Sequence, residues 1–249
     1  YPTIQEAVNQ GDNNVVFVRA GVYDEINIHV TTSNNTIIGE VDKNGQLLTV
    51  LDAQRAGCGF QLWKPETTVA NLVIENTSNG WPDNSGVWIH SESKNNTIVN
   101  CVFRRVRNAI FFDPGTDNSG MLIEDNRIYG YSYAGITLDS GWKYIIINNQ
   151  FHMNSKRGAA IELRNNVTES LIEMNMISTG DGIEVFDSDR VLIQSNELTC
   201  DDRNAVDPTG LNRWQHNGYS DFEYPFHVYN IHPGITIDNR AHLAHSMMY

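Results

Sequence analysis

Short runs of alternating apolar and polar residues recur along most of the chain, without the 3.6-residue period of an amphipathic helix. Similar runs stand at 98–103 ("IVNCVF"), 123–128 ("IEDNRI"), 146–151 ("IINNQF"), 172–177 ("IEMNMI") and 193–198 ("IQSNEL"). Their alignment places Cys101, Asn126, Asn149, Asn175 and Asn196 in one column, at spacings of 25, 23, 26 and 21 residues. A unit of this length cannot bury its apolar face alone, so the pattern predicts a solenoid of stacked units.

A second column keeps the same period. It contains Val87, Ile110, Ile136, Ile161, Ile183 and Val206, at spacings of 23, 26, 25, 22 and 23 residues. Because both columns repeat with the same period, they predict an all-β right-handed parallel β-helix. At the bend, Asn126, Asn149, Asn175 and Asn196 are expected to form a buried ladder of hydrogen bonds, although Asn is also an ordinary turn former because it tolerates the left-handed conformation.

The two ends of the chain differ from the repeat. "TIQEAV" at 3–8 matches a capping box and predicts a short helix at about 3–10 that covers the open end of the coil. From about residue 212 the repeat gives way to an aromatic, His-rich segment. The expected organisation is a β-helix over 1–211 and a tail over 212–249 that packs on the coil.

Charge and cysteine content limit the function classes. Acidic residues exceed basic ones by 13, and such a chain repels nucleic acid and anionic membranes, so neither is an expected partner. Three cysteines are too few for a disulfide framework, and an inter-chain disulfide through Cys58, Cys101 or Cys200 is one expectation. Sequons begin at Asn34, Asn76, Asn95 and Asn166 and fit an exported glycoprotein, although Asn-rich turns also produce them by chance.

Several segments resemble the secreted β-helix proteins of the NosD type. These are "YPTIQEAV", "VFVRAGVYDE", "NNTIIGE" and "NTIVNC", together with "NRWQHNGYSDF" at 212–222, in which the usual Tyr-Trp before Ser-Asp is reduced to Gly218-Tyr219. The resemblance implies a carbohydrate-binding or sugar-hydrolase-like repeat protein of archaeal or bacterial envelopes, located outside the cell or in the periplasm. Its motifs specify fold more than activity.

Alternation along the strands predicts two outward columns on one face. The first contains Trp88, Phe111, Thr137, Glu162, Glu184 and Asp207, and the second contains His90, Asp113, Asp139, Arg164 and Phe186. As a sugar-binding groove, this face would offer Trp88 and Phe111 as platforms beside Asp139 and Arg164. Glu162 and Glu184, about 5 Å apart across one rung, would suit a retaining glycosidase. Solvated acidic residues on a solenoid surface are the plainer interpretation.

Asp181, Asp201 and Asp202 resemble the three catalytic Asp residues of polygalacturonases. That family also needs Gly-His-Gly and Arg-x-Lys, and neither tripeptide occurs in this sequence. The interval between the Asp residues is also simply the repeat period. The signatures of pectate lyases and mannuronan epimerases are incomplete as well.

Two metal sites are also expected. Asp187 and Asp189, near Glu162 and Glu184, offer hard oxygen ligands for a cation such as calcium. His242 and His245 would share one face of a helix.

A complete scaffold beside incomplete enzyme signatures favours a non-catalytic protein of the cell envelope. We expect a structural, adhesive or sugar-binding module with copies of itself, other envelope components or extracellular polysaccharide as partners, and self-assembly into a surface layer or sheath. A polysaccharide hydrolase or lyase with an acidic groove is the alternative.

Overall fold

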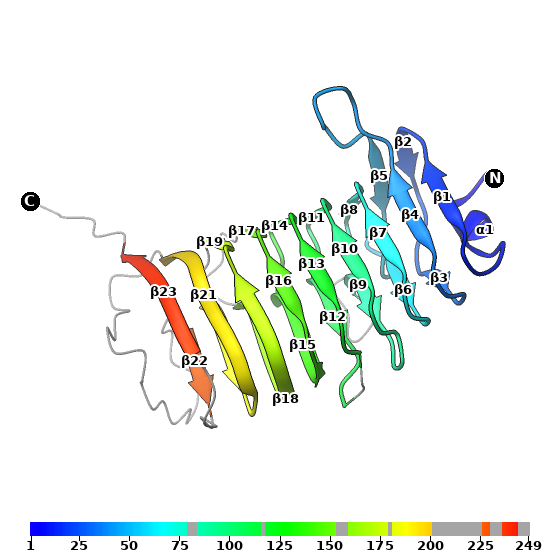
Figure 1. The fold of residues 1–249 in the computed structure, drawn as a ribbon. Helices are drawn as coiled ribbons and strands as arrows, with labels where there is room; N and C mark the ends of the chain where they lie inside the picture. Colours follow the sequence, from blue (N-terminus) through cyan, green and yellow to red (C-terminus); the bar gives the residue numbers. More distant parts are fainter. Residues whose placement is uncertain are drawn as a thin grey trace, which may run out of the picture.

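The structure, a computed structural model, describes residues 1–78, 84–115, 118–152, 159–178, 181–200, 226–229 and 236–243. The side chains of Asp181 and of residues 198–200, 226–229 and 236–243 are not described. The described chain is one helix followed by strands that all pair in parallel, apart from a single antiparallel bridge between Val41 and Leu47. The predicted all-β parallel solenoid with a short N-terminal helix is confirmed (Figure 1).

The strands lie on three faces that run along the solenoid. The first face contains β1 (Val15–Val18), β4 (Thr36–Gly39), β7 (Thr68–Ala70), β10 (Thr97–Val99), β13 (Leu122–Glu124) and β16 (Ile145–Ile147). The second face contains β2 (Gly21–Tyr23), β5 (Thr49–Asp52), β8 (Val73–Glu75), β11 (Val102–Arg104), β14 (Arg127–Tyr129), β17 (Gln150–His152) and β19 (Met176–Ser178). The third face contains β3 (Ile28–Val30), β6 (Phe60–Leu62), β9 (Ser85–Ile89), β12 (Asn108–Phe112), β15 (Ala134–Trp142), β20 (Asp181–Phe186) and β22 (Phe226–Tyr229).

Three longer strands turn a corner and serve two faces. β18 (Ala159–Glu173) begins on the third face and ends on the first, whereas β21 (Asp189–Cys200) and β23 (Thr236–Leu243) begin on the first face and end on the second. The repeat therefore extends beyond residue 211. The segment expected to be a tail contributes β22, which pairs with β20, and β23, which pairs with β21.

Register between coils follows the aligned apolar column. Ile110 pairs with Val87 and with Ile136, and Ile161 pairs with Ile136 and with Ile183. All five side chains are fully buried. The sixth member of the column, Val206, lies outside the described residues, and Ile183 pairs instead with Phe226 of β22. The outward column that was expected to run from Glu184 to Asp207 changes in the same way, since Glu184 pairs with His227.

The bend between the first and second faces holds a ladder of buried Asn side chains. Asn149 accepts hydrogen bonds at Oδ1 from the backbone N–H and the side-chain amide of Asn126, both at 3.0 Å. Its own backbone N–H and side-chain amide donate to Oδ1 of Asn175 at 2.9 and 3.1 Å. Asn196 repeats this arrangement with Asn175, and the backbone N–H of Cys101 donates to Asn126 at the other end. The ladder satisfies the polar groups that a buried bend would otherwise leave without partners.

The corner before the first face has a second, shorter polar row that the sequence alignment missed. Asn35 and Asn96 are fully buried there, and their Oδ1 atoms accept from the backbone N–H groups of Asn14 and Thr67. Each of these Asn residues follows the Asn of a sequon, so Asn34-Asn35-Thr36 and Asn95-Asn96-Thr97 are also the residues that build this corner.

α1 (Ile4–Val8) covers the N-terminal end of the stack (Figure 1). The Thr3 hydroxyl accepts from the backbone N–H of Glu6, as the capping pattern predicts. The N–H groups of Ile4 and Gln5 donate to the Glu25 carboxylate. The side chain of Gln5 also bonds to both the N–H and the carbonyl of His29 in β3, so a side-chain amide satisfies the edge strand.

Removal of one member of the Asn ladder should destabilise the coil strongly. Asn149→Ala leaves the N–H of Asn126 and the carbonyl of Ile123 buried without their partners, and we expect a loss of about 3 kcal/mol in the free energy of unfolding. Urea denaturation followed by circular dichroism measures it. The matched control is Asn44→Ala in the exposed loop between β4 and β5, expected to change stability by less than about 0.5 kcal/mol. Equal effects of the two substitutions would contradict the role of the ladder.

Candidate functional site

Two rows of outward side chains follow the third face. The first row contains His29, Gln61, Trp88, Phe111, Thr137, Glu162 and Glu184, which are in register from β3 to β20. The second row stands two residues further along each strand and contains Trp63, His90, Asp113, Asp139, Arg164 and Phe186. Parallel rungs are about 4.8 Å apart, so neighbours within a row are in contact distance.

An aromatic cluster occupies the N-terminal part of these rows. The rings of Trp63 and His90 are stacked with centroids 3.5 Å apart and an interplanar angle of 8°. Trp88 lies against His90 at 4.3 Å, and His29 is parallel to Trp63 at 6.4 Å. Trp63 is 38% exposed and Trp88 is partly exposed, so the cluster forms part of the surface. The sequence predicted Trp88 here, whereas Trp63 was missed because it follows the end of β6 rather than lying within it.

A directed chain of hydrogen bonds fixes the His90 ring. The backbone N–H of Cys58 donates to Oδ1 of Asn27, which also accepts from the side-chain amide of Gln61 at 3.3 Å. Oε1 of Gln61 therefore faces Nε2 of His90 at 3.2 Å, while Nδ1 of His90 faces Oδ2 of Asp113 at 3.0 Å. Both partners are acceptors, so this arrangement places an oxygen acceptor beside each nitrogen of the His90 ring.

Asp113 is the counter-charge of this cluster. Its other oxygen, Oδ1, accepts from the indole N–H of Trp88 at 2.6 Å. Burial by itself would raise the pKa of Asp113, but the hydrogen bonds from His90 and Trp88 and the charge of His90 outweigh burial and lower that pKa. The carboxylate is 24% exposed, whereas the His90 side chain is only 5% exposed. Asp113 therefore presents a fixed negative acceptor beside Trp63, which is exposed, and Trp88, which is partly exposed.

A second cluster surrounds Glu162 in β18. Its carboxylate is paired with the guanidinium of Arg164 and accepts from the hydroxyl of Thr137 at 3.3 Å. Burial is the main cause that raises the pKa of Glu162 to about 7, and the charge of Glu184 in the next rung adds to it, while Arg164 opposes both. Arg164 also donates to the hydroxyl of Tyr133 and lies over the rings of Tyr133 and Phe186. The predicted pairing of Glu162 with Glu184 is present in the register.

The third carboxylate of this face, Asp139, has its acceptors occupied. Both of its oxygens accept from the side-chain amide of Asn165, at 3.0 and 2.9 Å, and Oδ1 also accepts from the backbone N–H of Gly115. Asp139 is paired in register with Arg164.

The outward rows do not form an open groove along their whole length. Phe111, Thr137, Asp139 and Glu162 are all 5% exposed or less. Trp88, Arg164, Glu184 and Phe186 are partly exposed. The central part of the expected groove is therefore closed, and the exposed side chains lie on either side of it, at the Trp63–Trp88–Asp113 end and around Arg164, Glu184 and Phe186.

The structure describes only some of the remaining predicted acidic and histidine residues. Asp181 lies at the start of β20, and Asp201 and Asp202 lie outside the described residues. Asp187 is exposed, and Asp189 is paired with Arg190. Among the residues whose side chains are described, no group of three or more His, Cys, Asp or Glu is placed to hold a metal ion. His242 lies in β23, so the helical spacing assumed for His242 and His245 does not apply; His245 is outside the described residues.

Burial also corrects the expectation for the cysteines. Cys58 and Cys101 are fully buried thiols that form no disulfide, and neither can reach a second chain while the coil is folded. Burial raises the pKa of the Cys101 thiol to about 12, so it is not a reactive nucleophile. The side chain of Cys200 is not described.

The four sequon asparagines lie at the surface in left-handed turns. Asn34, Asn95 and Asn166 are exposed and Asn76 is partly buried, with φ angles from 54° to 70°. Asn76 donates to Asp52 and Asn34 donates to Asn13, so these two side chains already have protein partners. No helix in the described part of the chain is long and apolar enough to cross a membrane.

Replacement of Asp113 should weaken the N-terminal cluster. Asp113→Asn removes the counter-charge of His90, and we expect a loss of about 2 kcal/mol at pH 7 in urea unfolding followed by tryptophan fluorescence. Because the pKa of Asp113 is lowered, its contribution is present above the ordinary value of 3.8 and is lost as the pH falls through the lowered value. The wild-type protein should therefore lose more stability than the variant below pH 4. Parallel acid profiles would contradict this assignment.

The raised pKa of Glu162 makes stability depend on pH in the direction opposite to that expected for Asp113. Its folded pKa of about 7 lies above the ordinary 4.5, so its contribution is fully present below 4.5 and is lost as the pH rises through 7. Between pH 5 and pH 8 this change is about 2 kcal/mol. Glu162→Gln should remove it, which unfolding curves at the two pH values would measure. Asp189→Asn is the control and should retain the wild-type difference between the two pH values.

Comparisons with known proteins agree with this architecture. A structure of pectin methylesterase from Yersinia enterocolitica matches with a TM-score of 0.58 and 12% identity, covering 96% of this chain and 94% of that chain. A structure of pectin methylesterase from Aspergillus niger matches with a TM-score of 0.58 and 13% identity, covering 99% of this chain and 83% of that chain. At these identities the similarity shows the fold alone.

No curated protein sequence matches the chain. The family model described as the right handed beta helix region matches residues 85–240, well over half of the chain. The matched segment includes strands of all three faces, from β9 to β23. The protein belongs to the right-handed β-helix family.

Proposed function

We propose that the protein is a non-catalytic carbohydrate-binding module of an extracellular or cell-surface assembly, and that the third face contacts a neutral polysaccharide. The observation that carries the proposal is the surface formed by Trp63, Trp88 and Asp113. Trp63 is 38% exposed, and the Asp113 carboxylate, held by His90 and Trp88, is 24% exposed. Rigid aromatic surface beside fixed polar groups is suited to a sugar ring, which has apolar C–H faces and hydroxyl edges.

Charge favours a neutral ligand over a uronic acid. The chain carries a formal net charge of −13, and Asp113 is ionised at the centre of the site. The negative charge of the protein would repel a polyanionic polysaccharide that lies along the solenoid. The two structures compared above are of pectin methylesterases, and a methyl-esterified polysaccharide such as pectin is consistent with this requirement for low charge.

The state of the carboxylates supports binding rather than hydrolysis. Asp113 is bonded to His90 and Trp88, Asp139 to Asn165 and Gly115, and Glu162 to Arg164 and Thr137. A glycosidase needs two carboxyl groups that reach the same glycosidic bond. Here Glu162 is 3% exposed, so it is not placed to reach a polysaccharide in this conformation.

One observation favours the alternative function of a polysaccharide hydrolase or lyase. The pKa of about 7 at Glu162, beside Glu184, is in the range of a general acid at neutral pH. For this alternative, the face must open to admit a substrate. Turnover of neutral or acidic polysaccharides that is lost in Glu162→Gln and Glu184→Gln would replace the binding proposal with the enzymatic one.

The proposal includes an extracellular location and self-assembly through envelope components. Three of the four sequon asparagines, Asn34, Asn95 and Asn166, are exposed, which is compatible with export. Calcium bound near Asp187 and Asp189 is part of the same proposal. Size-exclusion chromatography tests assembly. A monomer at all concentrations, with and without calcium, would contradict the assembly part without affecting sugar binding.

Binding measured on a panel of neutral and acidic polysaccharides tests the main proposal. Trp63→Ala and Trp88→Ala should each weaken binding of a neutral polysaccharide about tenfold, since loss of one aromatic contact costs roughly 1.4 kcal/mol. Affinity gel electrophoresis with pectin of high methyl ester content, galactan and mannan provides the measurement. Trp142→Ala is the control, because Trp142 is 41% exposed but lies at the end of β15, away from this cluster. A larger effect of Trp142→Ala than of the two other substitutions would overturn the assignment of the third face.

A further inference from the structure

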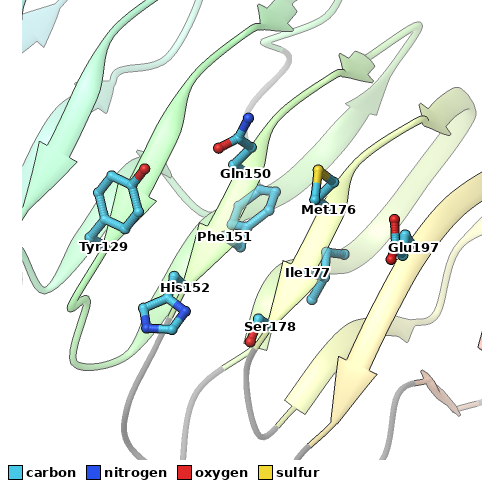
Figure 2. Close-up of a pocket in the computed structure, with 8 residues that line it drawn as sticks. All are labelled: Tyr129, Gln150, Phe151, His152, Met176, Ile177, Ser178 and Glu197. Atoms are coloured by element: carbon cyan, nitrogen blue, oxygen red, sulfur yellow. The ribbon is translucent and has the colours of Figure 1, made fainter. Parts of the chain in front are cut away.

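A surface groove on the second face lies outside the site described above. It crosses β14, β17, β19 and the second half of β21, and its volume is about 250 Å³ (Figure 2). The outward side chains at its wall come from four successive rungs and are Tyr129, Gln150, His152, Met176, Ser178 and Glu197. Phe151 and Ile177, each 2% exposed, belong to the buried core beneath it.

The register fixes the order of chemical groups along the groove. Tyr129, His152 and Ser178 are paired in one row, and Gln150, Met176 and Glu197 are paired in the other. The rings of Tyr129 and His152 are tilted by 59° with centroids 6.4 Å apart, so together they form an aromatic wall. Figure 2 shows Met176 and Glu197 on the side of the groove away from Tyr129.

The groove combines apolar surface with hydrogen-bonding groups of both kinds. Tyr129 and Met176, which is 53% exposed, supply apolar contact. Gln150 offers donors and an acceptor, Ser178 a hydroxyl, and Glu197 a carboxylate acceptor. Gln150 and Glu197 are exposed, so little desolvation of buried groups precedes binding.

These groups select the charge of a ligand. None of the described lining residues is Lys or Arg, and Glu197 is the acidic residue of the groove. Arg127, which is partly exposed, is paired in register with Gln150 at the β14 end, so the positive charge stands at one end of the groove and Glu197 at the other. Glu197 would repel a uronic acid or a phosphate, whereas a neutral sugar would find acceptors for its hydroxyl groups. The four rungs span about 14 Å along the axis, which makes the groove elongated rather than a pocket for one small group.

We infer that this groove on the second face is a binding site for a neutral oligosaccharide that runs along the solenoid axis, across the strands. Tyr129 and His152 contact the apolar faces of the sugar rings, and Gln150, Ser178 and Glu197 bind hydroxyl groups. The site is separate from the Trp63–Trp88–Asp113 surface, so the protein has two carbohydrate contacts on different faces. Two contacts on one rigid body allow it to cross-link polysaccharide chains.

Isothermal titration with short neutral oligosaccharides of galactose, mannose, xylose and glucose tests the inference on the full chain. For at least one of these series, Tyr129→Ala and Glu197→Gln should each weaken one class of site about tenfold or more, while a Trp63→Ala protein retains that class. Matched controls on the first face are Phe17→Ala, 58% exposed, and Glu124→Gln, which should bind as the wild type does. Circular dichroism and thermal unfolding establish that each variant is folded.

A further variant tests the selection by charge. Gln150→Arg places a second cation next to Arg127 and closer to the centre of the groove, and it should bring binding of a tri-galacturonate that the wild type does not bind there. The inference is overturned if no oligosaccharide binding depends on Tyr129 or Glu197. Loss of binding in Trp63→Ala alone would overturn the second-face site and keep the proposed function. Loss of binding in the second-face variants alone would keep the second-face site and overturn the proposed binding at the third face.

Discussion

In-register parallel pairing of each coil with the next is the constraint on which this structure depends. It places the same position of every repeat at one point along the axis, so an apolar residue such as Ile136 rests on Ile110 and Ile161. It also brings the bends together, where backbone groups are buried. The Asn126–Asn149–Asn175–Asn196 ladder supplies partners to those groups, and only a side chain with both donor and acceptor can repeat such a bond from coil to coil.

The same register governs the surface. Outward side chains are held about 4.8 Å apart, so charges in one row act strongly on one another. Asp113 is paired with His90, Glu162 with Arg164, and Glu75 on the second face with Arg104 and Arg105. Much of the acidity of the described outward rows is thus balanced within the coil. An acidic cluster in a solenoid sequence is therefore weak support for catalysis unless its carboxylates lack such partners.

Sequence periodicity predicted contacts correctly wherever a residue packs against the equivalent residue of the next coil. It aligned Val87 with Ile110 and Ile136, Glu162 with Glu184, and it located the Thr3 cap. It failed where the spacing between coils changes. Val206 and Asp207 continue the aligned columns in the sequence, yet in the structure β22 supplies Phe226 and His227 as the partners of Ile183 and Glu184.

The sequence pattern also did not predict contacts between non-equivalent positions of different coils. Glu25 caps a helix twenty residues earlier, Gln5 satisfies the edge of β3, and Trp63 stacks on His90 from the preceding coil. No repeat encodes such contacts, since each occurs once.

The sequence by itself determined the parallel β-helix, the length of its coils and the residues of its core, because these follow from a local alternation repeated at a fixed period. Only the tertiary structure decided which outward residues are accessible. Phe111 and Glu162 occupy the same row as Trp88, yet they are buried and Trp88 is not. Exposure depends on what packs over a position, and the residue pattern of a single strand does not contain that information.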